Sequence, residues 1–179
     1  MEYLIDSNSL IDAHEKWYRP QVFGSVWVCL ATHSNVRMTS FVYNEIKYPD
    51  ELALWTKNTF QKQIIVPTLE ITRAYNDVMN WITQSKRWNA AGISEWQSPD
   101  KADPWLIATA KVNSQTIVTL DGNGRATMPN IGSNSKKEPK INAVATQFNV
   151  PTMTIYELLE KLDYQFKLMI ENRSNMPWT

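Results

Sequence analysis

The sequence is poor in the residues that mark several common classes of protein. It has one cysteine among 179 residues, Cys29, which excludes an internal disulfide and fits the reducing cytosol. Because Cys29 lies in an apolar stretch, we expect a buried, unreactive thiol in a cytoplasmic protein. The two histidines, His14 and His33, are isolated, and no serine or cysteine hydrolase constellation accompanies them.

The chain also lacks long apolar runs and an excess of charge of either sign. No apolar stretch approaches the roughly 20 residues that a membrane span needs, and Asp6 interrupts the short apolar run at the N-terminus. We therefore expect neither a membrane span nor a signal peptide. Lys and Arg number 18, as do Asp and Glu, so bulk charge gives no attraction to nucleic acid, and any such binding must rest on local patches.

Apolar residues, by contrast, are plentiful. Hydrophobic residues make up 43% of the chain, which excludes a disordered protein. The length suits a single domain spanning residues 1–179, without repeats or linkers. Tryptophan is abundant, and we interpret its central cluster as core and lid packing rather than as base-stacking platforms; the cluster consists of Trp81, Trp88, Trp96 and Trp105.

The most informative stretch covers residues 102–122. Asp103 and Pro104 form a strong helix start, because Asp caps free N–H groups and Pro suits the first helical turn. Apolar residues then cover nearly every side of this helix, so we expect it to be buried. Residues 116–120 are β-branched and apolar, which predicts a strand covered on both faces, as in a parallel sheet. The helix would lie antiparallel to this strand, so Asp103 and Asp121 would share one edge of the sheet.

Strands and helices alternate along the rest of the chain, which predicts an α/β fold, an α/β/α sandwich around a short parallel sheet. We expect strands at residues 3–5, 36–39, 116–120 and, at an edge, 150–153, and a short extended piece at residues 64–67. We expect helices at residues 10–17, 23–31, 40–46, 51–60, 68–86, 103–112, 141–148 and 155–170. Residues 89–101 read as a loop, and residues 122–140 as a mobile surface segment.

Four acidic residues fall near one edge of the predicted sheet: Asp6, Glu45, Asp103 and Asp121. Each alone has an ordinary explanation, since Asp often caps a helix and Asp-Gly often forms a turn. Together they would repel one another unless a cation neutralised them. Mg²⁺ prefers oxygen ligands, so a few of these acids could hold it, with Asn8 as a neutral member.

These residues lie in segments that resemble the signature motifs of the PIN-domain superfamily. The similarity covers most of the chain and looks closest to a PIN-like bacterial branch akin to VapC-type toxins. Four segments carry it: Leu4-Ile5-Asp6-Ser7-Asn8, Ala102-Asp103-Pro104-Trp105-Leu106-Ile107-Ala108, Val118-Thr119-Leu120-Asp121 and Tyr156-Glu157-Leu158-Leu159. By this resemblance we expect a PIN-like sandwich.

The resemblance implies a Mg²⁺- or Mn²⁺-dependent endoribonuclease that hydrolyses RNA phosphodiester bonds. The four catalytic acids of the family map to Asp6, Glu45, Asp103 and Asp121, and the metal ligands among them to Asp6, Asp103 and Asp121. The toxin of a toxin–antitoxin pair is the implied role, with a small antitoxin protein as partner and a homodimer allowed.

Other residues take supporting roles in this assignment. Asn8 and Thr119 match the polar partners of the acids, while Asp100 is a rival of Asp103 that lacks the matched Ala-Asp-Pro context. Basic residues flank the acidic edge and could hold the RNA backbone, or could simply form a solvated loop: Lys101, Arg125, Lys136, Lys137 and Lys140.

Two other functions compete with the nuclease. One is a non-catalytic PIN-like module that binds RNA or a protein, against which the intact set of acids argues. The other is a phosphatase with Asp6 as nucleophile; such enzymes usually carry a second Asp two residues later, where this chain has Asn8.

Overall fold

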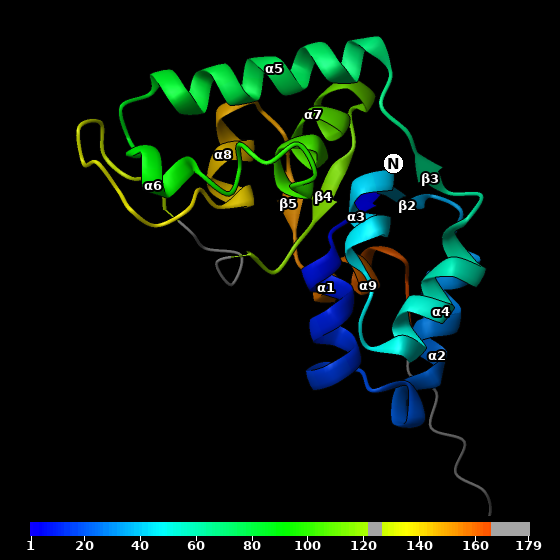
Figure 1. Ribbon diagram of the computed structural model, residues 1–179. Coiled ribbons are helices and arrows are strands. Elements are labelled where there is room, and N and C mark those ends of the chain that lie inside the picture. Colours follow the sequence, from blue (N-terminus) through cyan, green and yellow to red (C-terminus); the bar gives the residue numbers. More distant parts are fainter. Residues whose placement is uncertain (122–126, 166–179) are drawn as a thin grey trace, which may run out of the picture.

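The computed structural model describes residues 1–121 and 127–165, and in this part of the chain the centre is a parallel sheet (Figure 1). Its strands are β1 (Tyr3–Ile5), β2 (Val36–Thr39), β3 (Ile64–Ile65), β4 (Thr116–Val118) and β5 (Thr152–Met153). They lie in the order β3-β2-β1-β4-β5, and every neighbouring pair is parallel. The residues of β1 and β4 are all buried, as expected for central strands covered on both faces.

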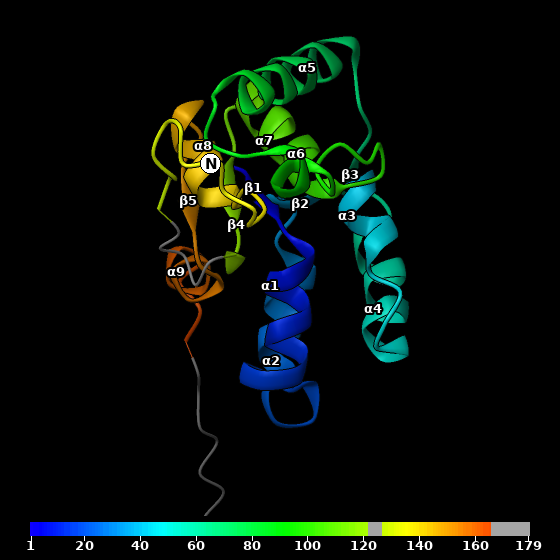
Figure 2. The same ribbon diagram turned by 60° about the vertical axis from the view of Figure 1, so that its left-hand side comes forward.

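Helices flank this sheet in two groups, which Figures 1 and 2 show above and below the strands. One group consists of α5 (Leu69–Gln84), α6 (Ala90–Ile93), α7 (Ala102–Asn113) and α8 (Ile141–Gln147). The other contains α1 (Ser7–Asp12) with its π-helical continuation η1 (Ala13–Trp17), α2 (Pro20–Thr32), α4 (Asp50–Phe60) and α9 (Ile155–Lys161). The expected α/β/α sandwich is confirmed.

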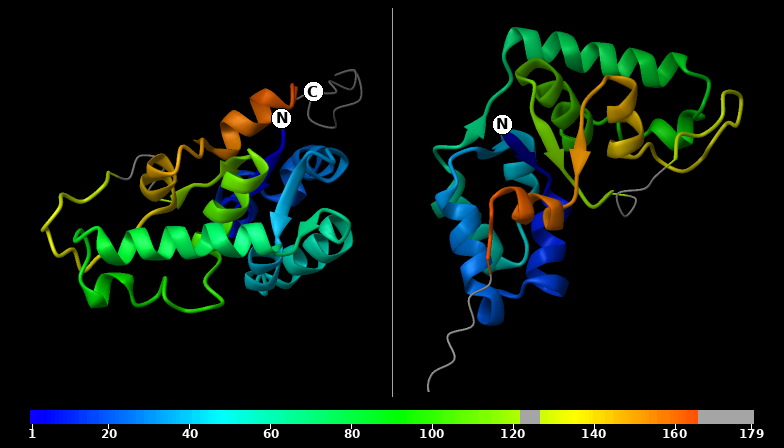
Figure 3. Two further views of the ribbon diagram at one scale, coloured as in Figure 1. Left: turned by 90° about the horizontal axis from the view of Figure 1, so that it is seen from above. Right: turned by 180° about the vertical axis from the view of Figure 1, so that it is seen from behind.

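Helix α7 packs against the sheet on one side and against α5 on another. Most of its residues from Ala102 to Ala110 are buried, and α5 packs along it, as the view from above in Figure 3 also shows. The helix ends at Ser114, whose left-handed backbone (φ 53°) turns the chain towards β4. Because α7 runs antiparallel to β4, its first turn lies at the edge of the sheet where the parallel strands end.

Several local predictions were wrong in extent. The expected loop at residues 89–101 contains the short helix α6. The Asn89 side chain caps this helix, because its Oδ1 accepts a hydrogen bond from Gly92 N at 3.0 Å. The last helix ends at Lys161 rather than near residue 170. Cys29 is half-buried rather than buried, and burial raises the pKa of its thiol.

The expected mobile segment, residues 122–140, is only partly described, because residues 122–126 lie outside the described residues. Its later part is anchored to the chain after α5 by backbone hydrogen bonds. Gly132 N donates to Lys86 O at 2.7 Å, and Ser135 N donates to Arg87 O at 3.0 Å. This anchoring matters for the site, because the same segment leads into Glu138 and Lys140.

The four central tryptophans serve packing, as predicted. Trp88 and Trp96 are buried, while Trp81 and Trp105 are half-buried against the apolar core. In the ranges 1–121 and 127–165, no helix combines the length and apolarity needed to cross a bilayer.

Candidate functional site

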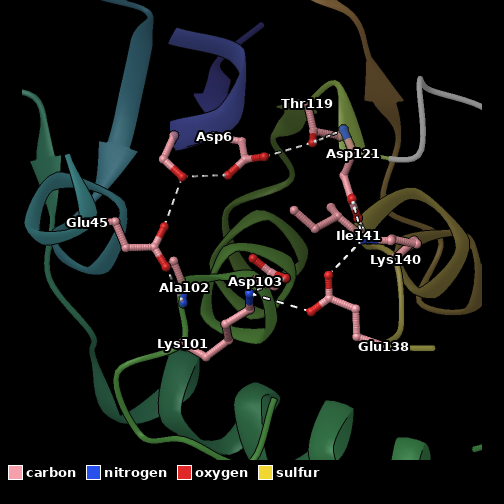
Figure 4. A network of polar contacts seen from close by, with 11 residues as sticks. Asp6, Glu45, Lys101, Ala102, Asp103, Thr119, Asp121, Glu138, Lys140 and Ile141 are labelled. Carbon is pink, nitrogen blue, oxygen red and sulfur yellow. Dashed lines mark hydrogen bonds and ion pairs between the residues drawn. The ribbon is translucent and has the colours of Figure 1, made fainter. Parts of the chain in front are cut away.

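The acidic residues predicted from the sequence meet at the edge where β1 and β4 end (Figure 4). Asp6 directly follows β1, Asp121 comes shortly after β4, and Asp103 lies in the first turn of α7. Glu45 is the last residue of α3 (Ser40–Glu45), the short helix that begins where β2 ends. Parallel strands place their carboxyl ends at one edge, which explains why segments so far apart in sequence converge here.

Asp6 is the most deeply placed acid, with 1% of its surface exposed. Its backbone N–H donates to Val118 O at 2.9 Å, which ties the end of β1 to β4. Thr119 Oγ1 donates to Asp6 Oδ2 at 2.8 Å. Burial raises the pKa of Asp6 to about 6; the Thr119 hydrogen bond opposes this shift, and the negative charges of Glu45 and Asp121 add to it.

Asp103 has an even more perturbed carboxyl group, of which 13% is exposed. Burial raises its pKa to about 7, and repulsion from Asp6, Asp121 and Glu45 adds to the rise. Lys101 opposes it, with Nζ at 3.4 Å from Asp103 Oδ2. Without a cation, Asp103 therefore stays partly protonated near neutral pH, and Asp6 takes up a proton more readily than an ordinary aspartate.

The structure argues against the ordinary helix-capping explanation for these two residues. Asp6 stands at the N-cap of α1, yet its carboxylate makes no capping hydrogen bond to that helix. Helix α7 begins one residue earlier than predicted, at Ala102, so Asp103 is inside the helix and Lys101 takes the cap position. The acceptor for Ala102 N is instead Glu45 Oε1, at 3.3 Å.

Glu45 and Asp121 each accept a hydrogen bond from the backbone N–H of the first residue of a neighbouring helix. Besides Ala102 N, Glu45 accepts a hydrogen bond from Ser7 Oγ at 2.9 Å. Asp121 Oδ2 accepts from Ile141 N, the first residue of α8, at 2.7 Å. These hydrogen bonds hold the two carboxyl groups in place at the edge of the site.

Two lysines and a further acid complete the network in Figure 4. Lys140 Nζ lies 3.1 Å from Asp121 Oδ1 and 2.8 Å from Glu138 Oε1. Lys101 Nζ lies 3.8 Å from Glu138 Oε2, so Glu138 links the two lysines. In the network drawn, five carboxyl groups therefore face two ammonium groups, which leaves an excess of negative charge when all are ionised.

Other residues named from the sequence have separate placements. Asn8 is exposed on the first turn of α1, and the position between Asp6 and Glu45 belongs to Ser7. Asp100, the rival third acid, is exposed. Lys136 and Lys137 are exposed on the segment before α8, and Arg125 lies outside the described residues.

Sequence reasoning missed two members of the network, Ser7 and Glu138. Ser7 follows Asp6 directly at the end of β1, and this position could have indicated that it belongs to the site. Asn8 was chosen instead because its amide is the better match to a metal ligand. Glu138 stands between the predicted basic residues Lys137 and Lys140, and nothing in its local sequence shows that it turns towards Lys101.

The side chains of the site are of the kind that bind a divalent cation, but their present arrangement is not yet a coordination site. Its donors are oxygens, and its buried negative charge is only partly balanced, which suits Mg²⁺ or Mn²⁺. However, within residues 1–121 and 127–165, no three or more His, Cys, Asp or Glu side chains already form a group that could hold an ion. Asp121 is bound to Lys140 and to Ile141 N, so a cation would have to compete with these partners.

Comparison with known proteins identifies a family. The family model described as "Domain of unknown function (DUF4411)" matches residues 3–166. The chain belongs to the DUF4411 family. No curated protein matches this DUF4411 chain. Among solved structures it is similar to that of FitAcB from Neisseria gonorrhoeae, at a TM-score of 0.48 and 14% sequence identity, over 86% of this chain and 98% of the other.

The raised pKa of Asp103 predicts how the stability of the metal-free protein depends on pH. Between about pH 4 and 7 the folded state keeps a proton that the unfolded state has lost, so the free energy of unfolding falls as the pH rises through this window. Asp103→Asn removes this titration. At pH 8 we expect the variant to exceed the wild type by on the order of 2 kcal/mol, because one pKa unit is worth about 1.4 kcal/mol and the contact with Lys101 is lost.

Urea unfolding in the presence of a chelator, at intervals from about pH 4 to 8, measures this difference, which should shrink towards zero at the acid end. Asp77→Asn is the matched control, since the Asp77 side chain is 65% exposed on α5. A variant that is less stable than the wild type at pH 8 would show that ionised Asp103 stabilises the fold.

Proposed function

We propose that this protein is a Mg²⁺- or Mn²⁺-dependent endoribonuclease that hydrolyses RNA phosphodiester bonds. The observation that carries the proposal is the pair of buried carboxyl groups of Asp6 and Asp103, with pKa values raised to about 6 and about 7 at the edge of a parallel sheet. Carboxyl groups whose pKa values are raised in this way by burial and neighbouring acids occur at functional sites more often than elsewhere. The resemblance of the surrounding segments to PIN-domain motifs supports the same assignment.

Asp6, Asp103 and Asp121 would hold the ion, with Glu45 beside them. When bound, the ion supplies Lewis-acid chemistry: it activates a water and stabilises the charge on the phosphate and the leaving oxygen. The chain orients its own acids through hydroxyl groups, because Thr119 Oγ1 donates to Asp6 and Ser7 Oγ donates to Glu45. Thr119 Oγ1 also accepts from Asp121 N at 3.0 Å, so one threonine positions two of the proposed ligands.

The lysines of the network supply the positive charge for an RNA backbone. Lys101 and Lys140 lie against the acids, and a cation that takes Asp103 and Asp121 would free each lysine from one of its two carboxylate partners and let it turn towards a phosphate, with Glu138 as the other partner. Lys136 and Lys137 extend the basic surface along the same segment, and Arg125 belongs to the proposed set although it lies outside the described residues. The overall charge balance makes such a local set of lysines necessary.

One observation favours a second candidate, a non-catalytic module that binds RNA or a protein. Lys101 and Lys140 already pair with Asp103 and Asp121, and the described residues contain no ready-made group of metal ligands. A module without catalysis would keep these ion pairs in every state and would need no cation. Cleavage that depends on Mn²⁺ therefore separates the two candidates.

The proposed biological role is that of a toxin silenced by a small antitoxin protein, with a homodimer allowed. This part of the proposal is supported by the resemblance to VapC-type toxins. We expect expression of the chain alone to slow bacterial growth, and co-expression of a neighbouring reading frame to restore it. Growth that is unaffected by expression of active protein would contradict the toxin role and leave the nuclease proposal to its own test.

The nuclease proposal predicts that Asp6→Asn and Asp103→Asn each lose Mn²⁺-dependent cleavage of a mixed RNA pool, by on the order of 100-fold or more. Each change keeps the shape of the side chain and removes one negative charge from the proposed ion site. Both variants should melt at or above the wild-type temperature without metal, because repulsion among the acids is relieved.

The assay compares RNA cleavage with Mn²⁺ and with chelator, and the exposed Asp77→Asn serves as the matched control that retains activity. Full activity in either site variant, or cleavage that is indifferent to chelator, would remove the metal-nuclease assignment. Lost activity together with a collapsed melting temperature would show that these acids act in folding instead.

A further inference from the structure

A stack of three aromatic rings stands beside the acidic site. Trp105 on α7 stacks with Tyr75 on α5, at a ring-centre distance of 4.0 Å and an angle of 16° between the planes. It also stacks with Phe41 on α3, at 4.6 Å and 8°. Trp105 Nε1 donates to Pro99 O at 3.1 Å, which fixes the indole. The Phe41 ring is therefore held in a defined orientation by a rigid neighbour.

Phe41 also lines a pocket of about 510 Å³ that opens next to the acids. The other lining residues are Asn44, Glu45, Lys47 and Asp100. Glu45 belongs to both places, since it lines the pocket and also accepts hydrogen bonds from Ser7 Oγ and Ala102 N. A ligand that reaches from the acidic site past Glu45 would thus enter this pocket directly.

We propose that this pocket binds one unpaired base of a single-stranded RNA, stacked on Phe41, while the adjoining phosphate lies at the acids. The proposal rests on the proposed ribonuclease function and names how the substrate is held. The pocket size falls within the range of about 300–1,000 Å³ typical of small-ligand sites, which suits a single nucleotide rather than a duplex.

The chemistry of the lining matches a nucleobase better than an apolar ligand. Phe41 offers an aromatic ring, on which every base can stack. The Asn44 amide supplies donors and an acceptor, and the Asp100 carboxylate can accept from an exocyclic amino group of a base. Lys47 adds a positive charge for the neighbouring phosphate.

An abasic scan tests the proposal directly. Fluorescein-labelled single-stranded RNA nonamers, each lacking one base, are titrated with the protein in Ca²⁺ in place of Mn²⁺, so that a cation can occupy the acids while binding is measured by anisotropy. For the wild type we expect affinity to fall about 10-fold when the missing base is the one in the pocket. Phe41→Ala should bind intact RNA about 10-fold more weakly and show no further loss with the abasic RNA, whereas Phe41→Tyr should stay close to the wild type.

Phe41 also packs on Trp105, so a second variant guards against an effect on folding. Asn44→Ala removes a pocket residue outside the ring stack, and exposed Asn58→Ala on α4 is its matched control. We expect Asn44→Ala to weaken binding of intact RNA only, and Asn58→Ala to change neither titration.

The outcomes separate this proposal from the nuclease proposal. Base-dependent binding that is lost in Phe41→Ala and Asn44→Ala supports the pocket even if no RNA is cleaved. An abasic penalty that persists unchanged in both variants overturns it, as does a wild type that does not bind the nonamers or shows no abasic penalty. Mn²⁺-dependent cleavage would still support the nuclease in those cases.

Discussion

The burial of ionisable carboxyl groups next to one another is the constraint on which the site depends. Asp6 and Asp103 lie where water cannot solvate their charges well, so burial raises both pKa values; Asp6 raises that of Asp103 further, and Glu45 and Asp121 raise both. The fold brings the two acids together because β1 and β4 are parallel neighbours, and α7 begins at the edge where both strands end. The arrangement costs stability in the metal-free protein, and under the proposed function a bound cation would offset that cost.

The four acids fall into two pairs with different surroundings. Glu45 and Asp121 accept backbone N–H groups at the starts of α7 and α8, so the fold itself fixes their positions. Asp6 has a threonine hydroxyl and Asp103 a lysine as partners, and these offset only part of the cost of burial. Glu45 and Asp121 therefore frame the site, and Asp6 and Asp103 carry the charge that a cation would neutralise.

Much of this arrangement could be predicted from the sequence, because it follows from local patterns. Asp6 and Asp121 stand just after apolar strands, and the parallel topology then places them at one edge. The rest depends on contacts that no local pattern encodes. Ser7 reaches Glu45 across 38 positions of sequence, and Glu138 reaches Lys101 from a segment whose course depends on its anchoring to the chain after α5. Helix α6 escaped prediction because so short a helix leaves little periodicity to detect.

The central claim is that the buried acids form a cation site at the end of β1 and β4. A crystal of the protein soaked in Mn²⁺ tests it most directly, through the anomalous difference map collected at a wavelength where manganese scatters strongly. The account predicts a peak among the carboxyl groups of Asp6, Asp103 and Asp121, with Lys140 displaced from Asp121. A fully soaked crystal with Mn²⁺ bound only elsewhere, and with the ion pair between Lys140 and Asp121 intact, would contradict it.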